Sequence, residues 1–139
     1  MRKYNIYICH KKIYNVMRLF HLFVLAMIIC HIFACCFWYL ATIQDQLNFS
    51  GQTWVEKVFQ QSQTEMNWQR VYLYAFYFSC STMSTVGYGD VTPSTNFEIW
   101  YSIFAMLFSS AVFGYILTYI GDIILDMNRE KEVYKKELR

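Results

Sequence analysis

The chain has 139 residues, of which 56% are hydrophobic and 20% aromatic, and its net charge is only +2. It is too apolar for an ordinary soluble domain and too short for several domains. Its residues form no activated nucleophile, carboxylate pair or phosphate-binding loop, and nothing in the pattern indicates nucleic-acid binding. We therefore expect a protein that is not an enzyme, needs no cofactor and does not bind nucleic acid.

The basic residues gather at the two ends of the chain. Residues 1–18 and residues 129–139 carry five Lys or Arg each, whereas only Lys57 and Arg70 lie between them. Loops rich in Lys and Arg stay in the cytosol, so we expect both ends in the cytosol and the middle outside. Two ends on one side require an even number of spans. The chain is therefore predicted to be a multi-pass integral membrane protein in contact with lipid, and we expect it in the plasma membrane.

Residues 1–18 are predicted to form a cytosolic amphipathic linker helix. Ile6, Cys9, Ile13 and Val16 recur at steps of three and four residues, while basic and polar residues fall on the opposite face. No small-residue cleavage site comes after them, which argues against a signal peptide.

Residues 19–41 are predicted to be an outer transmembrane helix. No formal charge occurs between Arg18 and Asp45, and about 20 apolar residues suffice to cross a bilayer. Trp38 and Tyr39 lie near the outer end of this stretch, where aromatic residues are enriched in membrane proteins.

Residues 42–69 form a polar outer segment that is rich in glutamine. It contains a glycosylation sequon at Asn48, on the side expected to face outward. Within it, Trp54–Phe59 is predicted as a short helix at the membrane interface.

Residues 70–84 are predicted to be a half-helix that enters the membrane and turns back. The stretch Val71–Gly89 has no formal charge, but only Val71–Phe78 is strongly apolar, and Ser, Thr and Gly dominate residues 79–89. A third span would also place the basic ends on opposite sides. Irregular backbone is tolerated at membrane depth where it is buried in protein or lines water. A re-entrant helix with an extended segment after it fits both observations.

The segment 85–90 reads Thr-Val-Gly-Tyr-Gly-Asp. Glycine adopts positive φ without steric cost, so alternating glycines can turn successive carbonyl oxygens toward one axis. Four such segments around an axis would form rings of oxygens that replace the water around an ion. The segment is identical to the selectivity filter of potassium channels, with the aspartate that usually comes next. The structural alternative is a tight glycine turn between two helices.

This resemblance implies a pore module that assembles as a homo- or hetero-tetramer, because one chain supplies a quarter of the ion cage. Its fold would be all-α, with two transmembrane helices flanking a re-entrant pore helix and the extended filter. The resemblance also implies which residues bind the ion: K⁺ would be bound by the Thr85 hydroxyl and by the carbonyls of Thr85, Val86, Gly87 and Tyr88. Gly87 and Gly89 would give the backbone its conformational freedom. Asp90 would lie at the outer mouth, and Tyr77 and Phe78 would brace the filter. The resemblance also places Ser81 among the pore-helix residues that support the filter, at a position where some family members carry a buried glutamate.

Residues 97–121 are predicted to be the inner transmembrane helix, because no formal charge lies between Glu98 and Asp122. Gly114 lies in its interior, where glycine costs about 1 kcal/mol relative to alanine. It permits either close helix packing or a gating hinge. Residues 122–139 alternate in charge and are predicted to continue as a cytosolic helical linker.

Two segments on either side of the filter indicate which group of potassium channels the chain resembles. Residues 30–39, Cys-His-Ile-Phe-Ala-Cys-Cys-Phe-Trp-Tyr, resemble the fifth helix of channels in the ether-à-go-go and cyclic-nucleotide-binding-domain group. Residues 120–128 resemble the inner-helix end of cyclic-nucleotide-gated channels. The chain has no arginine-rich voltage-sensing helix and no nucleotide-binding domain, so we expect the pore of a larger, voltage-gated-like channel, or else a self-sufficient two-span channel.

The expected function is potassium-selective conduction across a membrane. One alternative is a weakly selective cation channel of the hyperpolarisation-activated kind, although those channels usually have cysteine where Thr85 stands. Another is a non-conducting regulatory subunit that joins full-length partners.

Overall fold

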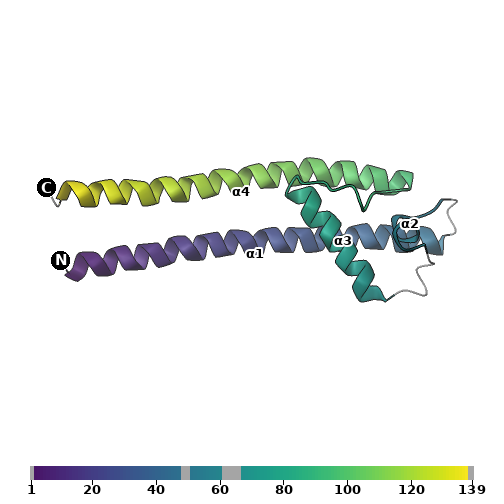
Figure 1. Ribbon diagram of the computed structural model, residues 1–139, viewed down its shortest axis with the longest axis horizontal. Coiled ribbons are helices and arrows are strands. Elements are labelled where there is room, and N and C mark those ends of the chain that lie inside the picture. Colours follow the sequence, from purple (N-terminus) through teal and green to yellow (C-terminus); the bar gives the residue numbers. More distant parts are fainter. Residues whose placement is uncertain (1, 48–50, 61–66, 138–139) are drawn as a thin grey trace. The chain divides into compact units, whose positions relative to one another are not determined.

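The computed structural model describes residues 2–47, 51–60 and 67–137, with side chains for residues 13–47, 51–60 and 67–129. Four helices occur in these ranges and no strand: α1 (Arg2–Gln46), α2 (Trp54–Phe59), α3 (Trp68–Met83) and α4 (Asn96–Glu137), as Figure 1 shows. The sequon at Asn48 lies outside the described residues. The short helix predicted at Trp54–Phe59 is confirmed at those bounds.

Two of the helices are long and apolar enough to cross a membrane. They are the stretches Ile13–Gln46 of α1 and Asn96–Arg129 of α4, with mean hydropathies of 2.5 and 1.9. Helix α3 has only 16 residues, which is below the length of a spanning helix. The prediction of an all-helical membrane protein with two spans around a shorter helix is therefore confirmed.

The helix boundaries differ from the predicted ones in three places. Helix α1 continues without a break from the predicted linker into the predicted outer helix, because no Gly or Pro interrupts residues 2–46. Helix α3 begins at Trp68, since the Asn67 side chain accepts the N–H of Gln69 at 3.0 Å and caps the helix there. Helix α4 likewise joins the predicted inner helix to the predicted linker.

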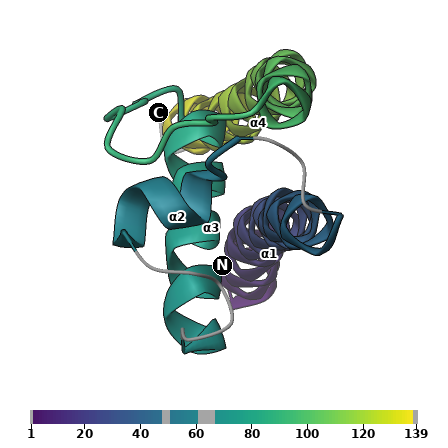
Figure 2. The same cartoon turned by 90° about the vertical axis from the view of Figure 1, so that its right-hand side faces the viewer.

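The chain divides into two compact units, residues 27–113 and residues 1–26 with 114–139. The first unit contains an aromatic core centred on Phe37, which is fully buried. Its ring stacks against Trp54 at 4.8 Å and against Phe78 at 4.4 Å between centroids. The Trp54 indole N–H donates to the Phe37 carbonyl at 3.3 Å. This core joins α1, α2 and α3, and Figure 2 shows α2 lying against α3.

Helix α2 is short but capped at both ends. Thr53 and Glu56 form a capping box, in which the Thr53 hydroxyl accepts the Glu56 N–H and the Glu56 carboxylate accepts the Thr53 N–H. Gln60 ends the helix in the left-handed conformation. The polar segment 42–69 thus contains a defined helix, at Trp54–Phe59.

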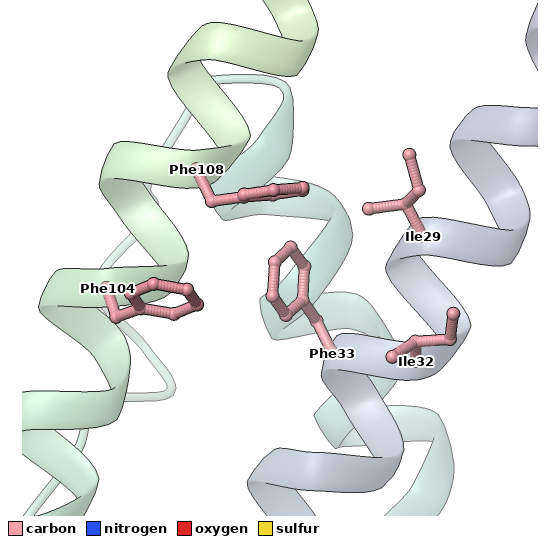
Figure 3. A pocket seen from close by; sticks show the side chains of 5 residues that line it. All are labelled: Ile29, Ile32, Phe33, Phe104 and Phe108. Carbon is pink, nitrogen blue, oxygen red and sulfur yellow. The ribbon is translucent and has the colours of Figure 1, made fainter.

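An apolar pocket of about 210 Å³ lies between α1 and α4 in the same unit. Figure 3 shows its lining, in which Phe33 of α1 faces Phe108 of α4 with their ring centroids 5.7 Å apart. Ile29, Ile32 and Phe104 complete the lining. Beside it, the Tyr101 hydroxyl donates to the Phe33 carbonyl at 2.8 Å and ties the two spans together.

The second unit brings the start of α1 to the end of α4. Leu22 and Ile123 are buried there. The Arg18 Nε donates to the Tyr119 hydroxyl at 2.9 Å, and its guanidinium lies 4.6 Å from the centre of the same ring. A hydrogen bond and a cation–π contact therefore join these two helices.

Candidate functional site

The segment Thr85–Asp90 comes directly after the end of α3. Ser84 caps the helix, and both its N–H and its hydroxyl donate to the Cys80 carbonyl, at 2.9 and 2.7 Å. The chain then leaves the helix without a strand or further helix until α4 begins at Asn96 (Figure 1). The filter sequence is thereby placed on irregular backbone between the two long helices.

The backbone of this segment alternates in handedness. Thr85, Gly87 and Gly89 have φ of +59°, +59° and +77°, whereas Val86 and Tyr88 between them do not have positive φ. Reversing the sign of φ at every second residue turns successive carbonyl oxygens to the same side of the chain. A row of oxygens on one side is the arrangement that can replace the hydration shell of a cation.

The positive φ of Thr85 was not predicted from the sequence, which indicated positive φ only at the two glycines. A β-branched residue at positive φ is a genuine outlier, and such a conformation costs about 1–3 kcal/mol. The Thr85 N–H donates to the Thr82 carbonyl at 3.1 Å, which holds this strained residue against the end of α3. Its two-residue spacing from Gly87, which continues to Gly89, was the available signal.

Ser81 supports the segment through its main chain. Its carbonyl accepts the N–H groups of Val86 and Gly87 at 3.0 and 3.2 Å. Its hydroxyl points back and donates to the Phe78 carbonyl at 3.0 Å. Ser81 therefore contacts the filter through its main-chain carbonyl near the end of α3 and not through its side chain.

The two neighbouring aromatic residues of α3 face different surroundings. Tyr77 lies parallel to Tyr88 at 6.2 Å between centroids, and its hydroxyl interacts with the Asp90 carboxylate. Phe78 is buried in the aromatic core against Phe37. Tyr77 thus contacts the filter directly, whereas Phe78 fixes the helix that carries it.

The filter is exposed within a single chain. Val86 and Tyr88 retain 53% and 71% of their accessible surface. A Cβ placed on Gly87 or Gly89 would have no atom within 4 Å. Glycine is therefore needed at these positions for its backbone conformation and not for lack of space in the chain.

Gly114 lies inside the continuous helix α4, at the point where the two compact units meet in sequence. The Thr118 hydroxyl donates to its carbonyl at 3.0 Å. Such side-chain bonds to a helical carbonyl often bend helices.

The described residues hold no group of three or more His, Cys, Asp or Glu side chains that could bind a metal ion. Cys30, Cys35, Cys36 and Cys80 are free thiols. The His31 ring is hydrogen-bonded to the Tyr72 hydroxyl at 2.8 Å and so links α1 to α3.

Comparison with known proteins agrees with this geometry. The profile of the Ion_trans_2 ion channel family matches residues 22–126. Potassium channel AKT2 of Oryza sativa subsp. japonica is 30% identical over 104 residues, which cover 75% of this chain and 12% of that protein. Potassium channel AKT2/3 of Arabidopsis thaliana is 25% identical over 121 residues, 87% of this chain and 14% of the relative.

Potassium channel KAT2 of Arabidopsis thaliana is 28% identical over 104 residues, 75% of this chain and 14% of the relative. The chain thus spans between 12% and 14% of the length of these three relatives. The family match covers most of both spans and all of α3 and of residues 85–90. The chain therefore belongs to the ion channel family.

Proposed function

We propose that this chain forms the potassium-selective pore of a tetrameric channel. The observation that carries the proposal is the alternation of positive φ at Thr85, Gly87 and Gly89. It occurs on a segment held at the end of α3, between two helices that can each cross a membrane. The names of the relatives, which are potassium channels, support the choice of ion.

The ion ligands in this proposal are the carbonyl oxygens of Thr85, Val86, Gly87 and Tyr88, with the Thr85 hydroxyl. Moving an ion of this kind out of water into a medium of low dielectric constant costs on the order of 20 kcal/mol. A single chain offers only one row of oxygens, so it cannot offset that cost. Four copies around an axis would close rings of oxygens around the ion, and the exposure of Val86 and Tyr88 leaves room for such neighbours.

The remaining roles are assigned along the direction of the chain. Asp90 lies at the outer mouth and attracts cations, while Tyr77 holds the outer end of the filter by its contacts with Tyr88 and Asp90. Gly114 is the hinge of the inner helix, since it lies where the two compact units divide. The basic ends of the chain face the cytosol, and the channel lies in the plasma membrane.

Flux from liposomes tests the proposal. The purified chain is reconstituted at tetramer stoichiometry, verified by native mass measurement, with K⁺ inside one set of vesicles and Na⁺ inside the other. We expect K⁺ efflux that barium blocks and little Na⁺ efflux. Equal fluxes of both ions would favour a weakly selective cation channel. Silence from a verified tetramer, combined with suppression of a co-reconstituted partner channel, would favour a regulatory subunit.

A further inference from the structure

Glu98 is a fully buried carboxylate outside the filter. It lies in the first turn of α4, and its Oε2 accepts the N–H groups of Ser94 and Thr95 at 2.8 and 3.1 Å. In return the Thr95 hydroxyl accepts the Glu98 N–H at 3.3 Å. These contacts form a capping box at the start of α4.

The second carboxylate oxygen of Glu98 reaches another element. Its Oε1 accepts the N–H of Trp54 at 3.2 Å, across 44 residues of sequence, at the start of α2. Glu56 offers the natural comparison, because it occupies the same position in the capping box of α2. The Glu56 carboxylate accepts the local Thr53 N–H at 3.1 Å, within its own capping box. Glu98 therefore caps its helix as Glu56 does and also bridges two helices.

Residues 91–95, which come directly after the filter segment, are held at several points by α2 and by Glu98. Val91, directly after Asp90, is buried in the aromatic core together with Trp54. The Lys57 ammonium donates to the Thr92 hydroxyl at 2.9 Å. Residues 91–95 are thus held by α2 on one side and by Glu98 of α4 at their far end. The segment has little freedom to move while these bonds persist.

We propose that Glu98 is a positioning residue of the outer mouth, whose carboxylate holds the outer end of the filter in its conducting form by joining α2 to residues 94 and 95. This inference rests on the proposed function of the filter. Glu98 acts on the filter through the chain that joins them. Gly89 and Asp90 lie within a few residues of Ser94 and Thr95, so release of residues 91–95 would allow the carbonyl groups at the outer end of the filter to turn. Charged hydrogen bonds to buried N–H groups are costly to lose.

The test compares Glu98→Gln with Glu56→Gln in the full chain. Glutamine keeps one acceptor oxygen but turns an NH₂ group toward buried N–H donors, so at least one of the three bonds to Glu98 is lost. We expect current through E98Q to decay about tenfold faster during maintained opening. High external K⁺ should slow that decay, and the ratio of K⁺ to Na⁺ permeability should not change. E56Q should decay like the unaltered chain.

A second variant removes the bridge alone. Replacing the Trp54 amide by an ester, through incorporation of the α-hydroxy acid of tryptophan, deletes the N–H and keeps the indole in the core. We expect the same faster, K⁺-sensitive decay. A variant that merely weakens folding would instead lower the number of channels without changing the decay of those that remain.

Hydrogen exchange supplies a readout that needs no current. In E98Q the amides of Ser94 and Thr95 should exchange at least tenfold faster, while those of E56Q should match the unaltered chain at these positions. Unchanged exchange and unchanged decay in E98Q would overturn the inference. A chain that carries no current would refute the proposed function, and the exchange result would still decide whether Glu98 holds this segment.

Discussion

Helix α3 and the filter segment after it are stabilised in opposite ways. Helix α3 buries Val71, Ala75 and Phe78 in the core of its unit. The filter leaves Val86 and Tyr88 largely exposed and is fixed by backbone bonds to the end of α3. Side-chain burial therefore stabilises the scaffold, whereas residues 85–90 are held mainly by backbone hydrogen bonds within the chain. Substitutions in the core of α3 should therefore change stability, whereas substitutions in residues 85–90 should change conduction.

The largest effect on stability is expected in the aromatic core. Phe37→Ala removes a fully buried ring that stacks between Trp54 and Phe78, and such truncations cost about 3–5 kcal/mol. The unfolding temperature of the solubilised protein should fall steeply. Trp100→Ala is the control, since Trp100 is 72% exposed and lies outside the core. Equal destabilisation by both variants would break the distinction between core and surface.

Gly87→Ala should abolish K⁺ conduction while leaving the fold and the assembly intact. An alanine in the left-handed region costs roughly 1–2 kcal/mol, and this cost arises in every copy around the axis. Gly121→Ala is the matched control, because a Cβ at either glycine meets no atom within 4 Å but Gly121 lies in a helix. Flux and native mass are measured together. A G87A tetramer that still conducts K⁺ selectively would contradict the role of backbone handedness.

Removing one hydroxyl between the start of α1 and the end of α4 should give a smaller effect. Tyr119→Phe deletes the hydrogen bond from Arg18 but keeps the ring under the guanidinium. A bond of this kind contributes about 1 kcal/mol, so the ratio of open to closed channels should rise about fivefold. Single-channel recording measures it. Tyr115→Phe, on the exposed side chain one turn earlier, should have no effect, and equal shifts would refute a specific role for the Arg18 contact.

The smallest effect is expected at Gly114. Gly114→Ala adds a methyl group into open space and favours the helix by up to about 1 kcal/mol. The channel should open more slowly in single-channel recordings, and its ion selectivity should not change. Opening rates that match the unaltered chain would favour close packing as the reason for this glycine.

Much of the architecture could be predicted because its signals are local. The two spans are indicated by uncharged apolar stretches of the sequence. The exact start of α3 could not be predicted, because it depends on one side-chain bond from Asn67. The continuity of α1 was not predicted, because the boundary was placed at Arg18 and a charged residue does not interrupt a helix.

The irregular backbone of residues 85–90 was predicted from the sequence, but the full pattern of its φ angles was not. Its two glycines indicate positive φ. Thr85 shares that conformation, but β-branched residues avoid it, so only the two-residue spacing from Gly87 pointed to Thr85. The support from Ser81 comes through a carbonyl that every residue possesses. The bridge from Glu98 to Trp54 joins positions 44 residues apart. Such bonds depend on tertiary packing, which a sequence pattern does not reveal.

The central claim is that the carbonyls of Thr85, Val86, Gly87 and Tyr88 from four copies bind the permeant ion. Crystals of the assembled protein, grown in Rb⁺ as an electron-rich substitute for K⁺, test it most directly through anomalous scattering. We expect ion peaks on the four-fold axis at the level of these carbonyls, and none when Na⁺ is the only cation. Carbonyl oxygens turned away from the axis, or no peaks in Rb⁺, would contradict it.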